Sequence, residues 1–198
     1  RQRIDAYSSL AQICQIPEGF DFPREQLPKC FYYTGPLLNP EGKEPVAFND
    51  LNFPFDQLTH PTLIYASLGT LQNRNWEIFK TIAQACLDVD AQLVVSLGNP
   101  QKDVSEVELP GSPLVVAYAP HQQLIERASL VITHAGMNAV IGTLSCGVPL
   151  VAIPITNEQP GIATRMVRTG AGEMVPLPKL TVKTLKETIV QVLADDAY

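Results

Sequence analysis

The stretch Leu130-Val131-Ile132-Thr133-His134-Ala135-Gly136-Met137-Asn138 decides both the fold and the site of this chain. Its apolar first part predicts a buried strand, and the residues after Gly136 have the spacing of a helix. A strand that turns through glycine into a helix leaves free backbone N–H groups and the positive end of the helix dipole at the strand's end. The glycine lets a ligand approach the backbone, and His134 adds a side-chain donor. The stretch therefore predicts a cradle for the diphosphate of a nucleotide-linked substrate.

Apolar runs and helical patterns alternate along the chain from residue 60 onward. The runs predict strands at residues 62–66, 93–97, 114–118, 130–133, 150–153 and 173–175. The patterns predict helices at residues 76–86, 121–127, 137–146 and 181–193, and one from Pro160 to a cap at Gly170. Continuous apolar strands separated by helices are typical of a parallel sheet. The expected fold class is therefore α/β, a Rossmann-like parallel sheet with helices on both faces.

Polar residues and glycines follow five of the predicted strands. They are Ser67-Leu68-Gly69-Thr70, Ser96 with Gly98, Tyr118-Ala119-Pro120-His121, His134-Ala135-Gly136, and the run from Pro154 to Gln159. In parallel α/β sheets, ligands bind beyond the carboxyl ends of the strands. Because these ends share one edge of the sheet, we expect the residues to meet in one site.

The composition of the chain excludes several classes of function. Its 198 residues carry a net charge of −6 and contain no basic block, so no nucleic-acid partner is expected. No apolar run reaches the ~18 residues of a membrane span, and no signal peptide is recognisable, so no transmembrane segment and a cytoplasmic location are expected. The four cysteines and three histidines are too scattered for a local metal site, and no metal is expected.

Residues 1–59 differ in pattern from the rest of the chain. Residues 10–16 and 31–34 predict short strands, and residues 39–59, which are rich in proline and acids, predict an interdomain linker. Residues 1–38 are too short to bury a core alone, so we expect them to be the tail of a preceding domain. Because the first residue is Arg1, the chain is expected to be part of a longer protein.

The segment from Tyr118 to Gln159 resembles the nucleotide-sugar signature of family 1 glycosyltransferases, enzymes of the two-domain GT-B fold. The matching pieces are Tyr118-Ala119-Pro120-His121, Thr133-His134-Ala135-Gly136-Met137-Asn138, Gly147-Val148-Pro149-Leu150-Val151 and Pro154-Ile155-Thr156-Asn157-Glu158-Gln159. Ser67-Leu68-Gly69-Thr70 matches the family's loop after the first strand of its C-terminal domain. The run from Glu158 to Ala163 is most similar to bacterial members that act on apolar acceptors, of the zeaxanthin and macrolide type. Residues 1–38 then resemble the end of the N-terminal acceptor domain, and residues 60–198 resemble the C-terminal donor-binding domain.

The resemblance implies a role for each matched residue. Those that would bind the donor diphosphate are His134, Gly136, Asn138, Ala139, Ser67, Gly69 and Thr70. Those that would hold the nucleoside are Tyr118, as a stacking surface for the base, with Ala119 and His121. Glu158 and Gln159 would grip hydroxyls of the sugar. A structural role remains the alternative for each, such as a strand-end side chain for Tyr118 or a solvated loop for Glu158 and Gln159.

Gly142 departs from the family pattern. Relatives usually place glutamate or aspartate four residues after the motif asparagine, here Asn138, where it holds the ribose hydroxyls. Glycine has no side chain for this contact, so the contact is expected from another residue or from the backbone. UDP and dTDP therefore both stay candidates for the donor nucleotide.

The reaction that the resemblance implies is an inverting hexosyl transfer. The donor would be a nucleoside-diphosphate sugar of the UDP-glucose type, and the acceptor would be a hydroxyl of an apolar small molecule. The scheme includes no cofactor and no metal. The family's general base is a histidine near the start of the N-terminal domain, and no residue here matches it. We therefore expect this chain to bind donor without catalysing efficient transfer.

Three other functions stay open on the sequence alone. A nucleotide-sugar epimerase of similar architecture would also bind a sugar diphosphate at a helix start, and it would change the sugar without an acceptor. A non-catalytic nucleotide-sugar-binding module is favoured by Gly142. An NAD-dependent oxidoreductase is disfavoured, because Gly170-Ala171-Gly172 follows a helix and lacks the third glycine of the dinucleotide fingerprint.

Overall fold

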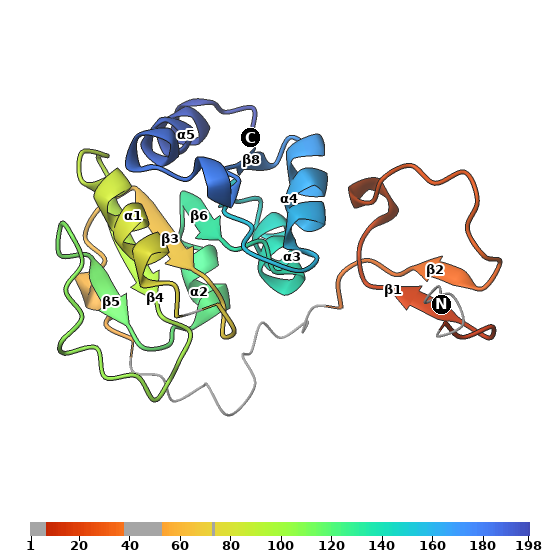
Figure 1. Ribbon diagram of the computed structural model, residues 1–198, viewed down its shortest axis with the longest axis horizontal. Helices are drawn as coiled ribbons and strands as arrows, with labels where there is room; N and C mark the ends of the chain where they lie inside the picture. The colour runs from red at the N-terminus through yellow and green to blue at the C-terminus, as the bar shows by residue number, and fades with distance from the viewer. Residues whose placement is uncertain (1–6, 38–52, 73) are drawn as a thin grey trace.

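A parallel six-stranded sheet forms the centre of the molecule in the computed structural model, which describes residues 7–37, 53–72 and 74–198 (Figure 1). Its strands are β3 (Leu63–Ser67), β4 (Gln92–Ser96), β5 (Leu114–Val116), β6 (Leu130–Thr133), β7 (Leu150–Ala152) and β8 (Gly172–Met174). They lie in the order β5-β4-β3-β6-β7-β8, and each neighbouring pair is parallel. The expectation of a Rossmann-like parallel sheet is confirmed.

The order of the strands reverses at the centre of the sheet. From β3 the chain builds outward through β4 and β5, and it then returns to place β6 on the other side of β3. The last residues of these two central strands, Ser67 and Thr133, are paired in register. The loops after β3 and β6 therefore start side by side, at the kind of switch point where open α/β sheets bind their ligands.

Helices cover both faces of the sheet because strand side chains alternate between the two faces. On one face Ile64 and Ala66 of β3 pack with α1 and α5, and on the other Leu63 and Tyr65 pack with α2. The helices α3 and α4 lie on the same face as α2, against β7. The helices are α1 (Trp76–Cys86), α2 (His121–Ile125), α3 (Met137–Ser145), α4 (Gln159–Arg168) and α5 (Val182–Ala194).

The predicted elements are present, with ends that differ by a few residues. The strand β5 ends at Val116, so Tyr118 follows it rather than closing it. Pro160 lies in the first turn of α4, and Gly170, with a φ of 73°, follows its end as expected. A short 3-10 helix, η5 (Leu177–Lys179), precedes α5, whose start is capped by Thr181.

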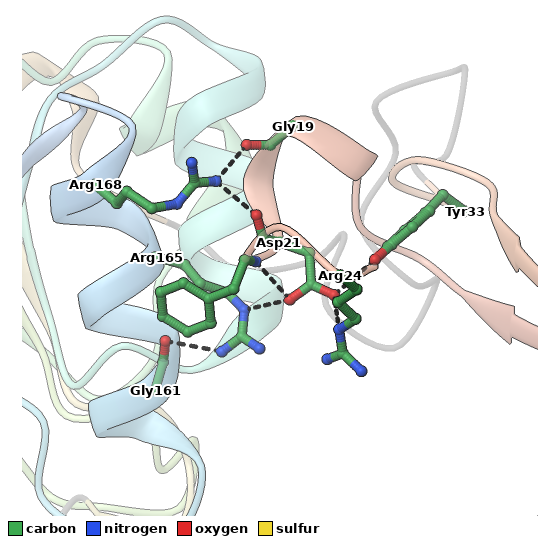
Figure 2. A network of polar contacts seen from close by, with 8 residues as sticks. Gly19, Asp21, Arg24, Tyr33, Gly161, Arg165 and Arg168 are labelled. Atoms are coloured by element: carbon green, nitrogen blue, oxygen red, sulfur yellow. Dashed lines mark hydrogen bonds and ion pairs between the residues drawn. The ribbon is translucent and has the colours of Figure 1, made fainter. Parts of the chain in front are cut away.

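The N-terminal segment docks against the outer side of α4. It contains the parallel strands β1 (Gln12–Cys14) and β2 (Phe31–Tyr33), which lie side by side (Figure 1), and in chain order the 3-10 helix η2 (Glu18–Phe20) comes between them. Ile16 and Phe20 are buried in one cluster with Ile162 and Met166 of α4. Arg168 Nη2 donates to the carbonyl oxygens of residues 19 and 21 at 2.7 and 2.6 Å (Figure 2). Apolar and polar contacts thus hold the same interface.

The predicted linker falls partly on described residues. Residues 38–52 lie outside them, whereas Phe53 is 8% exposed and packs in the cluster that contains Tyr65. A 3-10 helix, η4 (Phe55–Gln57), follows it. The division into residues 1–38, 39–59 and 60–198 stays a prediction. No helix in the described ranges has the length and apolar character needed to cross a bilayer.

Candidate functional site

A cavity of about 610 Å³ opens at the carboxyl edge of the sheet, where β3, β4 and β6 end. All the site residues named from the sequence line it: Ser67, Gly69, Thr70, Tyr118, Ala119, His121, His134, Gly136, Asn138, Ala139, Glu158 and Gln159. The structure therefore brings these residues together at the expected edge. What each of them binds stays a prediction.

The imidazole of His134 lies between two glycines from different loops. A Cβ on Gly69 would lie 2.7 Å from His134 Cε1, and a Cβ on Gly136 would lie 2.7 Å from Nε2. Real Cβ atoms do not approach so closely, so glycine at both positions leaves the space for the ring. Gly69 also has a φ of +69°, which side-chain-bearing residues rarely adopt. Besides its expected role of admitting a ligand, Gly136 therefore makes room for the His134 ring, which the sequence does not reveal.

Burial makes the charged form of His134 unfavourable. The pKa of His134 is lowered mainly by this desolvation, and the Ser67 backbone and the Glu158 carboxylate oppose the shift in part. Within the described part of the chain, Nδ1 is enclosed and makes no hydrogen bond of acceptable geometry. Nε2 is therefore the ring nitrogen left for a ligand, and an anion placed next to it would favour protonation of the ring.

The start of α3 offers backbone donors next to this ring. Gly136 occupies its N-cap position, and no side chain caps the helix there. The first bond within the helix runs from the Val140 amide to the Gly136 carbonyl, so the amides of residues 137–139 precede it. Ala135 has a φ of 64°, an unfavourable conformation of the kind that concentrates at functional sites. Free N–H groups and the positive end of α3 together suit an anion.

A tyrosine of β3 orients His121 in the lining of the cavity. The hydroxyl of Tyr65 and His121 Nδ1 share a hydrogen bond of 2.9 Å, and the two rings meet edge to face at 5.4 Å. Tyr118 lines the same region, and Ala119 next to it is buried. The orientation of His121 is thus set by Tyr65, a residue that sequence analysis does not select.

The carboxamide oxygen of Gln159, another lining residue, is bound by the loop before α4. Its Oε1 accepts from the amides of Ile155 and Thr156, both at 2.9 Å, while the residue is 5% exposed. A carbonyl oxygen has two lone pairs, so only the NH₂ group of Gln159 is left for a ligand. Glu158 is exposed beside it. The sequence pattern predicts one role for Glu158 and Gln159, whereas the structure gives them different surroundings.

A further group of lining residues is not predicted from the sequence. These are Tyr65, Leu71, Gln72, Gln122 and Met137, whereas Ser96, Gly98 and Asn157 line the cavity as expected from their places after the strands. Only Gln122 and Met137 lie in the first turn of a helix, whereas Tyr65 lies within β3 and Leu71 and Gln72 lie in the loop after it, so the sequence holds little signal for these three. Asn157 has a φ of 56°, which asparagine tolerates better than most residues.

The lining favours an anionic ligand that also carries hydroxyl groups. Glu158 is the only Asp, Glu, Lys or Arg among the described residues of the lining, so an anion there is bound by neutral donors, His134 and the dipole of α3. Amide and hydroxyl groups around them suit sugar hydroxyls. In residues 7–37, 53–72 and 74–198, no group of three His, Cys, Asp or Glu side chains is arranged to hold a metal ion.

Comparison with solved structures gives the same architecture. The glycotransferase of kitacinnamycin superposes with a TM-score of 0.76 at 24% identity, over 95% of this chain and 48% of that one. The calicheamicin glycosyltransferase CalG4 superposes with a TM-score of 0.72 at 25% identity, over 95% of this chain and 46% of that one. The fold is that of GT-B glycosyltransferases, of which this chain spans about half.

Comparison with known sequences assigns the family. A zeaxanthin glucosyltransferase of Pantoea ananas is 38% identical over 87% of this chain and 40% of its own length. One from Pseudescherichia vulneris is 34% identical over 99% of this chain and 46% of its own length. The chain thus spans less than half the length of these relatives. The family model "UDP-glucoronosyl and UDP-glucosyl transferase" matches residues 6–198, and the chain belongs to that family.

Proposed function

We propose that the cavity binds a nucleoside-diphosphate sugar and that the protein transfers its hexose, with inversion, to a hydroxyl of an apolar small molecule. The observation that carries this proposal is the position of His134 between Gly69 and Gly136, beside the uncapped start of α3. Family membership supports the donor class, and the Pantoea and Pseudescherichia relatives are named for an apolar acceptor.

The diphosphate binds at the start of α3 in this proposal. The acceptor oxygen forms a bond to the anomeric carbon while the bond from that carbon to the β-phosphate oxygen breaks. The electron pair of the broken bond stays on the diphosphate, so its negative charge grows in the transition state. Amides at residues 137–139 and Nε2 of His134 stabilise that charge without reorganising, which is the main source of catalysis in such a step.

The base and the hexose of the donor bind at different parts of the cavity in this proposal. The base stacks on Tyr118, which follows β5, and the hexose meets the Gln159 NH₂ group and the Glu158 carboxylate at the start of α4. The general base that takes the acceptor's proton has no counterpart among these residues. We therefore infer that this chain binds donor and does not catalyse efficient transfer alone.

Calorimetric titration with UDP-glucose and dTDP-glucose tests the donor site. We expect saturable binding of one or both, and a loss of about tenfold or more in His134→Ala, because a charge-assisted hydrogen bond is removed. The matched control is His60→Ala, since His60 pairs with Asp90 outside the cavity. Absence of binding, or equal affinities of the His134 and His60 variants, would overturn the proposal.

A product assay distinguishes glycosyl transfer from epimerisation of the sugar nucleotide. UDP-glucose and an apolar alcohol are incubated with the chain, and the sugar products are identified. We expect neither glycoside nor altered sugar nucleotide. Efficient glycoside formation would place the general base within these 198 residues. Conversion of the donor without acceptor would identify an epimerase instead.

A further inference from the structure

Gly142 lies at the contact between α2 and α3. It is a buried residue of α3, one turn after Asn138, and it has no backbone angle that requires glycine. A Cβ at this position would have one neighbour, Oε1 of Gln122, at 4.0 Å. The side chain of Gln122 from α2 therefore occupies the space beside Gly142 into which a longer side chain would extend.

Hydrogen bonds to Glu126 and Cys146 orient the Gln122 carboxamide. Its Nε2 donates to Glu126 Oε1 at 3.1 Å and to Cys146 Sγ at 3.2 Å. A carboxylate only accepts hydrogen bonds, so the amide nitrogen must face Glu126 and the oxygen must face the other way. This orientation leaves Oε1 on the side of Gly142, and Gln122 lines the cavity.

Gln122 lies between the place assigned to the base of the donor and the place assigned to its diphosphate. The base is assigned to Tyr118, just before α2, and the diphosphate to the start of α3. A pentose connects the base to the diphosphate in every nucleoside diphosphate. The pentose must therefore cross the junction of α2 and α3, where Gln122 contributes a carbonyl oxygen and pentose hydroxyls contribute donors.

We propose that Gln122 Oε1 accepts a hydrogen bond from a pentose hydroxyl of the donor, with Gly142 leaving room for its side chain. This inference rests on the proposed function, because it presumes a nucleoside diphosphate in the cavity. The acceptor is neutral, so it adds no repulsion toward the adjacent diphosphate. If the bound hydroxyl is the 2′-hydroxyl, Gln122 distinguishes ribonucleotides from deoxyribonucleotides, because only ribonucleotides carry that group.

Binding of three ligands tests this role: UDP, 2′-deoxy-UDP and 3′-deoxy-UDP. The wild-type chain is expected to bind at least one of the deoxy ligands about three- to tenfold more weakly than UDP, because one neutral hydrogen bond contributes about that factor to the affinity. Gln122→Ala should bind UDP more weakly than the wild-type chain by the same factor. Its affinity for that deoxy ligand should equal that of the wild-type chain. Gln123→Ala is the matched control, because Gln123 is exposed on the same helix and does not line the cavity.

Two results would overturn the inference. One is a wild-type chain that binds all three ligands equally, and the other is a Gln122→Ala variant that loses the same factor toward each ligand. If the variant has a lowered Tm, Gln122→Met, which keeps the side chain's length without an acceptor, replaces it. Failure of the wild-type chain to bind UDP at all would instead contradict the proposed function, so the two failures are distinguishable.

Discussion

Arg165 Nε donates to Asp21 Oδ1 at 2.8 Å, which joins the N-terminal segment to α4 across 144 positions of the chain (Figure 2). The Asp21 side chain is 2% exposed, and its other oxygen accepts from the Tyr33 hydroxyl at 2.7 Å and pairs with Arg24 at 2.9 Å. The helix α4 begins with Gln159 at the cavity. Asp21 and its neighbours thus hold α4 in place through Arg165. The first residue of α4 is Gln159, which we propose binds the sugar of the donor.

Replacing Asp21 by asparagine should destabilise the fold strongly. The variant keeps the shape of the side chain but leaves Arg165 and Arg24 without their counter-charge, and breaking a buried ion pair costs about 3–5 kcal/mol. Because Arg165 is 19% exposed, we expect the lower part of that range. Urea unfolding gives the free energy, with Glu77→Gln as control, since the exposed Glu77–Lys80 pair contributes less than about 1 kcal/mol. Equal losses in both variants would contradict a structural role for the Asp21 pair.

Acid should remove the same stabilisation over a defined pH range. Burial alone would raise the pKa of Asp21, but hydrogen bonds from Tyr33, Arg165 and the Phe22 amide, with the charge of Arg24, hold it at about 2 instead of 3.8. A carboxyl with a depressed native pKa stabilises the fold above its unfolded value, and this contribution is lost as the pH falls toward the native value. We expect a loss of about 2 kcal/mol between pH 4 and pH 2 in unfolding free energy. Asp21→Asn should lack this component, and an unchanged acid profile in the variant would refute the assignment.

The sheet and the contents of the cavity could be predicted because both follow from local patterns. Apolar runs mark β3 and β6, and residues at strand ends such as Ser67 and His134 must share an edge once the strands are parallel. The packing of His134 against Gly69 could not be predicted, because it depends on how two distant loops approach after the sheet has formed. The same holds for Arg165 and Asp21, whose pairing is set by docking and not by periodicity.

Donor binding should be accompanied by proton uptake at His134. In the free protein, burial lowers the pKa of His134, and a diphosphate beside Nε2 raises it again. A group whose pKa rises on binding takes up a proton, so affinity should increase as the pH falls from 8 to 6. Calorimetry of UDP-glucose in buffers of different ionisation enthalpy measures this uptake, and the esterified diphosphate of this ligand does not titrate in that range. Uptake that persists in His134→Ala would assign the proton to another group.

Two glycine-to-alanine changes should act in opposite directions. In Gly69→Ala the new Cβ would lie 2.7 Å from the His134 ring at a φ of +69°, so the fold should lose about 1 kcal/mol or more and donor binding should weaken. In Gly142→Ala the new Cβ has an ordinary contact inside a helix, so stability should rise by about 0.5–1 kcal/mol. Thermal unfolding and UDP titration of both variants test this contrast. A stabilised Gly69→Ala variant that keeps its affinity would show that the ring needs no space there.

Gln159→Glu should separate the two roles of this side chain. A glutamate oxygen can still accept from the amides of Ile155 and Thr156, so the loop before α4 should keep its conformation and the Tm should change little. The NH₂ donors are lost, so UDP-glucose should bind several-fold more weakly while UDP binds as before. Gln159→Leu removes both functions and should lower the Tm as well, because two buried amides lose their acceptor. Parallel losses for UDP and UDP-glucose in the glutamate variant would place Gln159 away from the sugar, since only the sugar distinguishes the two ligands at that end of the cavity.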